Sequence, residues 1–185
     1  MTETLCFFAK AWVYNSSHLF EKIGVKADKI IPWEFIVNDT PASFSPKILP
    51  VNERPWTLFY VGAVIEAKGV GDVLDAIAQL RAKNFPVRLR IAGRSENDYF
   101  INKVRQLQIE DCVEFLGVVQ NQAVLPLMRE ADVVLVPSHH DYPEGLPLAI
   151  TDALCTRTPI ITSEHPKLVV VQMAQSNCGI STMES

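Results

Sequence analysis

The short apolar segment "EGLPLAITDAL" has one carboxylate near each end. Glu144 stands on a glycine turn, and Asp152 follows eight residues later. If a helix begins near Pro147, Glu144 precedes the free backbone N–H groups of its first turn. Asp152 then lies about 8 Å further along the axis, at 1.5 Å per residue. Carboxylates accept hydrogen bonds from hydroxyls, and a helix N-terminus attracts phosphate. This order suits a nucleoside diphosphate sugar. The alternative is that Glu144 only complements the helix dipole and Asp152 faces water.

A second candidate for phosphate binding is the stretch "VGAVIEAKGVGDVL". Gly62 permits close backbone approach at the end of a predicted strand, and Lys68 offers a point charge to phosphate oxygens. Gly69 and Gly71 form G-x-G, but Leu74 stands where a dinucleotide fingerprint has its third glycine. On this stretch alone, a tight strand-to-helix turn with a solvated lysine is the better interpretation.

The loop "HHDYPEG" before Glu144 is polar. His139 and His140 are adjacent, so their side chains diverge, and no third ligand is evident; we therefore predict no metal site. A loop lining a ligand cleft is the preferred interpretation, with Asp141 and Tyr142 as candidate contacts to a sugar.

These residues depend on a regular alternation of strands and helices from residue 57 onward. We predict strands over 57–64, 87–93, 112–117, 132–138 and 158–163. Helices are predicted over 71–83, 96–108 and 122–131, with Asn121 capping the third, and a fourth begins near Pro147. Alternating strands and helices predict an α/β fold with a doubly wound parallel sheet, in which ligands bind at the carboxyl ends of the strands.

The first part of the chain does not follow this alternation. Residues 7–25 are typical of a strand and a short helix, and residues 31–56 are rich in Pro, Asn and Ser, as in a linker. We expect residues 1–50 to be a piece of a preceding domain with an interdomain linker. Residues 54–185 form the ligand-binding domain, and we expect it to be truncated at its C-terminus.

Composition limits the class of protein. The 185 residues are 48% hydrophobic and carry a net charge of -4, which argues against a broad nucleic-acid surface. The four cysteines have no metal-ligand spacing, and the N-terminus lacks the features of a signal peptide. A cytoplasmic protein with reduced thiols is the resulting expectation.

In its motifs the sequence resembles the retaining glycosyltransferases of family 4, which have the two-domain GT-B fold. The resemblance covers residues 54–185 and the C-terminal, donor-binding domain. The family places two glutamates eight positions apart in a Pro-Ser, Glu-Gly, Glu-Ala and Thr-Pro context. The chain has Pro137, Ser138, Glu144, Gly145, Asp152, Ala153, Thr158 and Pro159 in register, and "GAVIEAKG", "FLGVV" and "LMREADVVLVPS" also match.

The resemblance implies roles for particular residues. Glu144 would contact the donor sugar near the anomeric centre as the candidate catalytic carboxylate. The backbone of Gly145 and Leu146, with Pro147 at the helix start, would lie along the diphosphate, and Gly62 and Lys68 would complete that site. Asp152 would hold the ribose hydroxyls, and the backbone near Val118 would meet the base. Such enzymes need no metal or other cofactor.

Four residues depart from the family's usual pattern in ways that bear on donor binding. Ala63 stands where the family usually has a phosphate-binding arginine, and Asp152 is one methylene shorter than the usual glutamate. Arg157 replaces a glycine before Thr-Pro, and whether it restores the lost charge is left open. Lys167 replaces a glutamate.

The sequence therefore predicts transfer of a glycosyl group from a UDP- or GDP-linked sugar to a sugar, polysaccharide or lipid-linked acceptor, with retention. One alternative is a nucleotide-sugar-binding module or inactive fragment without turnover; another is a GT-B enzyme such as a sugar-nucleotide epimerase. The expected partners include a separate acceptor-domain chain and, through parts that this chain lacks, a membrane surface. No nucleic acid is expected.

Overall fold

The computed structural model describes residues 9–12, 22, 24–33, 40–49, 54–142 and 147–163. The chain divides into two compact units, residues 1–38 and residues 39–185.

The second unit is built on one five-stranded sheet in which every strand pair is parallel. Its strands are β3 (Trp56–Val61), β4 (Val87–Ala92), β5 (Val113–Gly117), β6 (Val133–Val136) and β7 (Ile160–Thr162). The order across the sheet is β5-β4-β3-β6-β7. The chain therefore moves outward from β3 in one direction, returns, and moves outward in the other, so that the winding reverses between β3 and β6.

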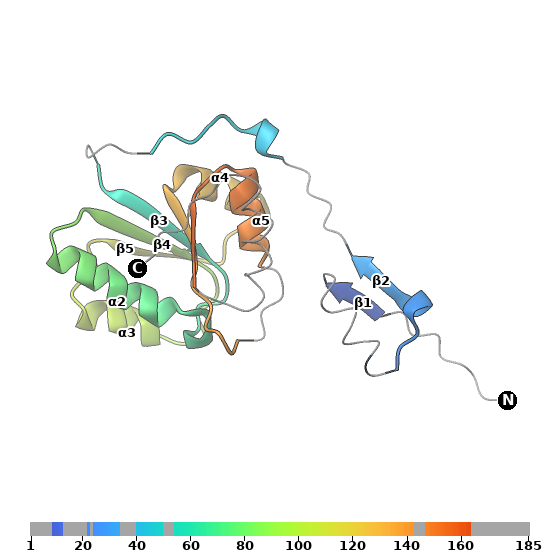
Figure 1. The fold of residues 1–185 in the computed structure, drawn as a ribbon. Helices are drawn as coiled ribbons and strands as arrows, with labels where there is room; N and C mark the ends of the chain where they lie inside the picture. Colours follow the sequence, from blue (N-terminus) through green and yellow to red (C-terminus); the bar gives the residue numbers. More distant parts are fainter. Residues whose placement is uncertain are drawn as a thin grey trace. The chain divides into compact units, whose positions relative to one another are not determined.

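Helices cover both faces of this sheet: α2 (Val70–Ala82), α3 (Tyr99–Gln106), α4 (Asn121–Glu130) and α5 (Leu148–Cys155). Figure 1 shows α2 and α3 on one side of the strands and α4 and α5 on the other. The predicted doubly wound α/β fold is confirmed. Asn121 is the first residue of α4 and Gln120 occupies the cap position, so the predicted asparagine cap is wrong by one residue.

The two faces of the sheet are separated by the alternation of side chains along each strand. Tyr60 packs with α2 and α3, whereas its neighbour Phe59 packs with α4 and α5. On β6 Val133 and Leu135 face the first pair of helices, and Val134 faces the second pair. The central strands β3 and β6 are apolar almost throughout because both of their faces are covered, whereas β4 and β5 carry the charged residues Arg88, Arg90 and Glu114.

The amino-terminal edge of the sheet is held by Asp132, whose side chain is fully buried. Its two carboxylate oxygens accept hydrogen bonds from the Arg54 guanidinium at 2.7 Å each, and one also accepts from the Thr57 backbone N–H at 2.8 Å. Burial disfavours ionisation of the Asp132 carboxyl, but these hydrogen bonds outweigh it and hold its pKa below the ordinary value of 3.8.

Residues 40–49 lie against the same unit. The short helix η2 (Pro41–Ser43) packs on α5, and the Arg157 Nε donates to the Pro41 carbonyl at 2.6 Å. Arg157 follows α5 and adopts a φ of 55°, in the left-handed region where glycine is favoured. Because it precedes β7, Arg157 lies at the amino-terminal edge of the sheet. It therefore does not restore charge at the opposite edge, where the predicted donor site lies.

In the first unit, β1 (Ala9–Trp12) pairs in parallel with β2 (Ile30–Trp33), and the short helix η1 (Ala27–Lys29) precedes β2. The strand β2 lies largely within the segment that we predicted to be linker, and for Ile31, Pro32 and Trp33 that prediction is wrong. A proline lacks the N–H that a sheet interior requires, so the sequence favoured a loop there.

Candidate functional site

Two of the predicted site residues, Gly62 and Lys68, lie where the winding of the sheet reverses, on the turn that follows β3. The chain leaves β3 through Gly62 and forms the short helix η3 (Glu66–Lys68) before α2 begins. It leaves β6 at Pro137 and runs toward the start of α5. In an open α/β sheet this crevice is the usual position for a ligand.

Close backbone packing joins the two loops of this crevice. Gly69 has a φ of 69°, and a Cβ added to it would lie 2.0 Å from the Pro137 carbonyl oxygen. The neighbouring turns after β3 and β4 are equally close, since a Cβ on Gly93 would lie 1.7 Å from the Gly62 carbonyl oxygen. This contact requires a glycine at position 93, and the predicted approach of the Gly62 backbone to a phosphate stays a prediction.

Lys68 ends the short helix η3 after β3 and contacts the loop that follows β6. Its Nζ is 4.5 Å from the centroid of the Tyr142 ring, within the range of a cation–π interaction. Both side chains are half-buried. The contact positions the ammonium group beside the loop that leads to Glu144.

His139 connects the same two loops through both its backbone and its ring. Its backbone N–H donates to the Ala67 carbonyl at 3.0 Å, and its Nε2 lies 2.8 Å from Asp72 Oδ2 in the first turn of α2. Neither His139 nor His140 belongs to a group of three potential metal ligands in the described part of the chain. His139 instead anchors the loop after β6 to the turn that carries Lys68.

Asp152 lies in the second turn of α5. Pro147, which is buried, precedes the first residue of α5, as the sequence predicted. Asp152 is half-buried, and burial raises the pKa of its carboxyl. Among the described residues its carboxyl has no hydrogen-bond or ion-pair partner, although its backbone carbonyl accepts from the Thr156 N–H. A half-buried carboxylate without a protein partner can accept hydrogen bonds from a ligand.

Val118 lies at the same edge of the sheet, directly after β5, and is 71% exposed. Two strand spacings separate β5 from β3, a lateral distance of about 10 Å. Glu144, Gly145 and Leu146, and Lys167 further along, lie outside the described residues, so their predicted positions are not tested.

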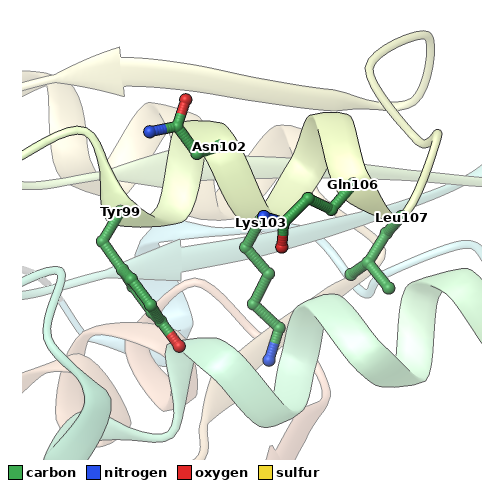
Figure 2. Close-up of a pocket in the computed structure, with 5 residues that line it drawn as sticks. All are labelled: Tyr99, Asn102, Lys103, Gln106 and Leu107. Atoms are coloured by element: carbon green, nitrogen blue, oxygen red, sulfur yellow. The ribbon is translucent and has the colours of Figure 1, made fainter.

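A pocket of about 360 Å³ lies elsewhere, along α3, and contains none of the predicted site residues. It is lined by Tyr99, Asn102, Lys103, Gln106 and Leu107. Figure 2 shows Lys103 extending from α3 toward α2, where its Nζ pairs with Asp75 at 2.8 Å. The lysine is therefore already neutralised, and nothing in this pocket resembles the crevice at the strand ends.

The sequence does not indicate the pairing of Asp72 with His139, because 67 positions separate them and only the adjacency of β3 and β6 brings them together. Nor does it indicate that Arg94, which follows β4, lies beside the Ala63 turn. The glycine immediately before Arg94, at the end of a predicted strand, was the available indication.

The winding of the sheet reverses between β3 and β6, and glycine turns stand at the carboxyl ends of the strands. These two features define the second unit as a Rossmann-like α/β domain. The chain belongs to the glycosyl transferases group 1 family, whose model matches residues 42–180.

Similar proteins agree with this family. The chain is 29% identical over 156 residues to the putative colanic acid biosynthesis glycosyltransferase WcaL of Escherichia coli K12, covering 80% of this chain and 38% of that protein. WaaG, a glycosyltransferase involved in lipopolysaccharide biosynthesis, superposes with a TM-score of 0.68 at 19% identity, over 92% of this chain and 48% of WaaG. The pneumococcal O-GlcNAc transferase GtfA, solved with UDP and GlcNAc, gives a TM-score of 0.63 at 15% identity, over 85% of this chain and 30% of GtfA. The chain thus spans less than half the length of these relatives.

The described residues contain no helix that is both long and apolar enough to cross a membrane.

Proposed function

We propose that this chain supplies the donor-binding half of a retaining, family 4 type glycosyltransferase. The observation that carries the proposal is the position of Lys68 in the crevice between β3 and β6, on a turn tied to the loop that leads to Glu144. The family match supports glycosyl transfer in general, and the UDP bound to GtfA supports a nucleotide-linked donor.

The donor lies along the carboxyl edge of the sheet in this proposal. The Lys68 ammonium neutralises the diphosphate, with the backbone of Gly62, Gly145 and Leu146 and the start of α5 at Pro147 beside it. Asp152 accepts hydrogen bonds from the ribose hydroxyls, a role that fits its half-buried carboxyl, which has no partner among the described residues. The base lies near Val118.

Glu144 contacts the donor sugar near its anomeric carbon and is the candidate catalytic carboxylate. Bond cleavage leaves negative charge on the departing diphosphate, and Lys68 with the N–H groups at the start of α5 stabilises that charge. The proposed chemistry relies on this electrostatic stabilisation and assigns no step to a metal or cofactor.

The acceptor is a sugar, polysaccharide or lipid-linked glycan, as the surface-polysaccharide roles named for WcaL and WaaG suggest. In this proposal residues 1–50 contribute part of an acceptor domain or its linker, and a separate chain or further segments complete the catalytic cleft. We place the protein in the cytoplasm, a proposal supported by the buried cysteines Cys112 and Cys155, which form no disulfide among the described residues.

Isothermal titration with UDP-glucose, UDP-N-acetylglucosamine and GDP-mannose tests donor binding, and release of free UDP or GDP over hours tests turnover. We expect saturable binding of one conjugate, and Glu144→Gln to remove turnover while nucleotide binding persists. Binding without turnover in the unchanged chain supports the alternative, a nucleotide-sugar-binding module. A folded chain that binds no conjugate refutes the proposal.

A further inference from the structure

We propose that Arg94 supplies the second positive charge for the donor diphosphate, in place of the arginine that is absent at Ala63. This inference rests on the proposed function. It assigns a binding role to a residue outside the motifs that carry the family resemblance.

The first observation is that Arg94 differs from every other arginine of the chain. The sequence has eight arginines, all within the described residues. Seven make side-chain hydrogen bonds: Arg54, Arg81, Arg88, Arg90, Arg105, Arg129 and Arg157. Arg94 is exposed, and its guanidinium makes no hydrogen bond or ion pair with a described residue. Its charge is therefore available to a ligand.

The second observation is the position of Arg94 beside the turn that carries Ala63. Arg94 follows Gly93 at the carboxyl end of β4, the strand adjacent to β3. Its backbone carbonyl accepts from the Val64 N–H at 2.9 Å, and the Gly62 N–H donates to the Ala92 carbonyl at 3.0 Å. The two turns are thus bonded to each other on both sides of Ala63.

The third observation concerns the charge available along this edge. Within the described residues, the segments that follow the five strands carry two lysine or arginine side chains, Lys68 after β3 and Arg94 after β4. Each phosphate of a diphosphate diester carries a negative charge, so one lysine leaves the diphosphate incompletely neutralised. An arginine can also bond two phosphate oxygens at once, which a lysine does less well.

Two acidic residues follow Arg94 closely in the sequence, namely Glu96 and Asp98. Neither forms an ion pair with Arg94 in the structure. Ser95 forms a parallel bridge with Val64, so the chain stays paired with the Ala63 turn one residue beyond Arg94, and the Ser95 hydroxyl donates to the Asn97 carbonyl at 2.7 Å. Glu96 and Asp98 are both exposed. Because neither carboxylate pairs with it, the guanidinium is available to a ligand.

The test is isothermal titration of the full chain with UDP and GDP, and then with UMP or GMP for whichever base binds. The variants are Arg94→Gln, the double variant Ala63→Arg/Arg94→Gln, and Arg105→Gln. Arg105 is an exposed arginine on α3 whose guanidinium, among the described residues, bonds only to Asn102, at 3.1 Å, and it serves as the matched control. Thermal unfolding of each variant verifies that it is folded.

We expect Arg94→Gln to weaken binding of the nucleoside diphosphate by about tenfold, the effect of losing one charge-assisted hydrogen bond. Binding of the monophosphate should fall less, Arg105→Gln should bind as the unchanged chain does, and Ala63→Arg should restore most of the lost affinity.

Equal affinity of Arg94→Gln and the unchanged chain for the diphosphate would overturn the role of Arg94 and leave the proposed function standing. An equal loss for diphosphate and monophosphate would also overturn it, because Arg94 would then not act at the second phosphate. A folded, unchanged chain that binds neither UDP nor GDP would instead refute the proposed function itself.

Discussion

Replacing Gly69 by alanine tests whether the Lys68 turn and the loop after β6 depend on backbone contact. Two costs are expected. A left-handed conformation costs an alanine about 1 kcal/mol relative to glycine. The added Cβ would also lie 2.0 Å from the Pro137 carbonyl oxygen, and relieving such overpacking costs about 1–3 kcal/mol more.

Gly117 is a matched control for this substitution. Its φ of 66° is nearly that of Gly69, but a Cβ added there has no atom within 4 Å. Gly117→Ala should therefore lower the free energy of unfolding only by the cost of the left-handed conformation, about 1 kcal/mol. The difference between the two variants isolates the contact with Pro137.

Urea denaturation followed by circular dichroism measures the free energies of unfolding. We expect Gly69→Ala to be less stable than Gly117→Ala by about 2 kcal/mol. In Gly69→Ala the loop before Glu144 must also move away from Lys68, so binding of UDP or GDP should weaken. Equal stabilities of the two variants would refute the reasoning, since the close approach of Gly69 to Pro137 would then carry no energy.

Three further variants have separable effects. Asp132→Ala removes a buried carboxylate bonded by Arg54 and should lower the free energy of unfolding by about 3 kcal/mol, a value reduced because Arg54 is half-exposed. Since the folded-state pKa of Asp132 is lowered, its carboxylate stabilises the fold fully above the ordinary pKa of 3.8, and this stabilisation is lost as pH falls through the folded-state pKa. Acid unfolding curves of Asp132→Ala should lack this pH-dependent loss of stability. Asp152→Asn should weaken nucleotide binding yet leave the free energy of unfolding at pH 7 unchanged or higher. The pKa of Asp152 is raised in the folded state, so its ionisation lowers stability as pH rises from 3.8 through the folded-state pKa. A clear loss of stability of the variant at pH 7 would contradict this. His139→Ala should cost no more than about 1 kcal/mol, since its pair with Asp72 is solvent-exposed, but titration with UDP or GDP should show weaker binding. Unchanged affinity in that variant would mean that the loop needs no anchor.

Most of the fold could be predicted from local patterns. Strands such as Val133–Val136 are buried on both faces and are recognisable as short apolar runs. The helix α2 follows from apolar residues at helical spacing, among them Val70, Leu74 and Ile77, which are buried. Parallel strands joined by helices then require a covered sheet.

The order of the strands could not be predicted, because it depends on long-range pairing. Asp72 and His139 come into contact only because β6 pairs with β3. The position of Arg94 beside Ala63 likewise depends on the pairing of β3 with β4. Residue types therefore indicated Lys68 and Asp152 as site candidates, while the contact of Asp72 with His139 and the position of Arg94 were found only in the structure.

For the strand β2, local sequence patterns predicted the wrong structure. Its residues Ile30–Trp33 include a proline within a segment rich in loop-forming residues, so local composition predicted a linker. Pairing with β1 outweighs that local preference. For Arg157 the sequence left open a role in binding charge, and the structure places its side chain on the Pro41 carbonyl instead.

The central claim is that the crevice between β3 and β6 binds the diphosphate of a nucleotide-linked donor. Its most direct test is isothermal titration of UDP and GDP into the unchanged chain, Lys68→Ala and Lys83→Ala. Lys83 is an exposed lysine directly after the far end of α2 and is the control for loss of one positive charge. We predict saturable binding of one nucleotide to the unchanged chain and to Lys83→Ala, and loss of that binding in Lys68→Ala. Equal binding to Lys68→Ala and Lys83→Ala, or no binding to a folded, unchanged chain, would contradict the claim.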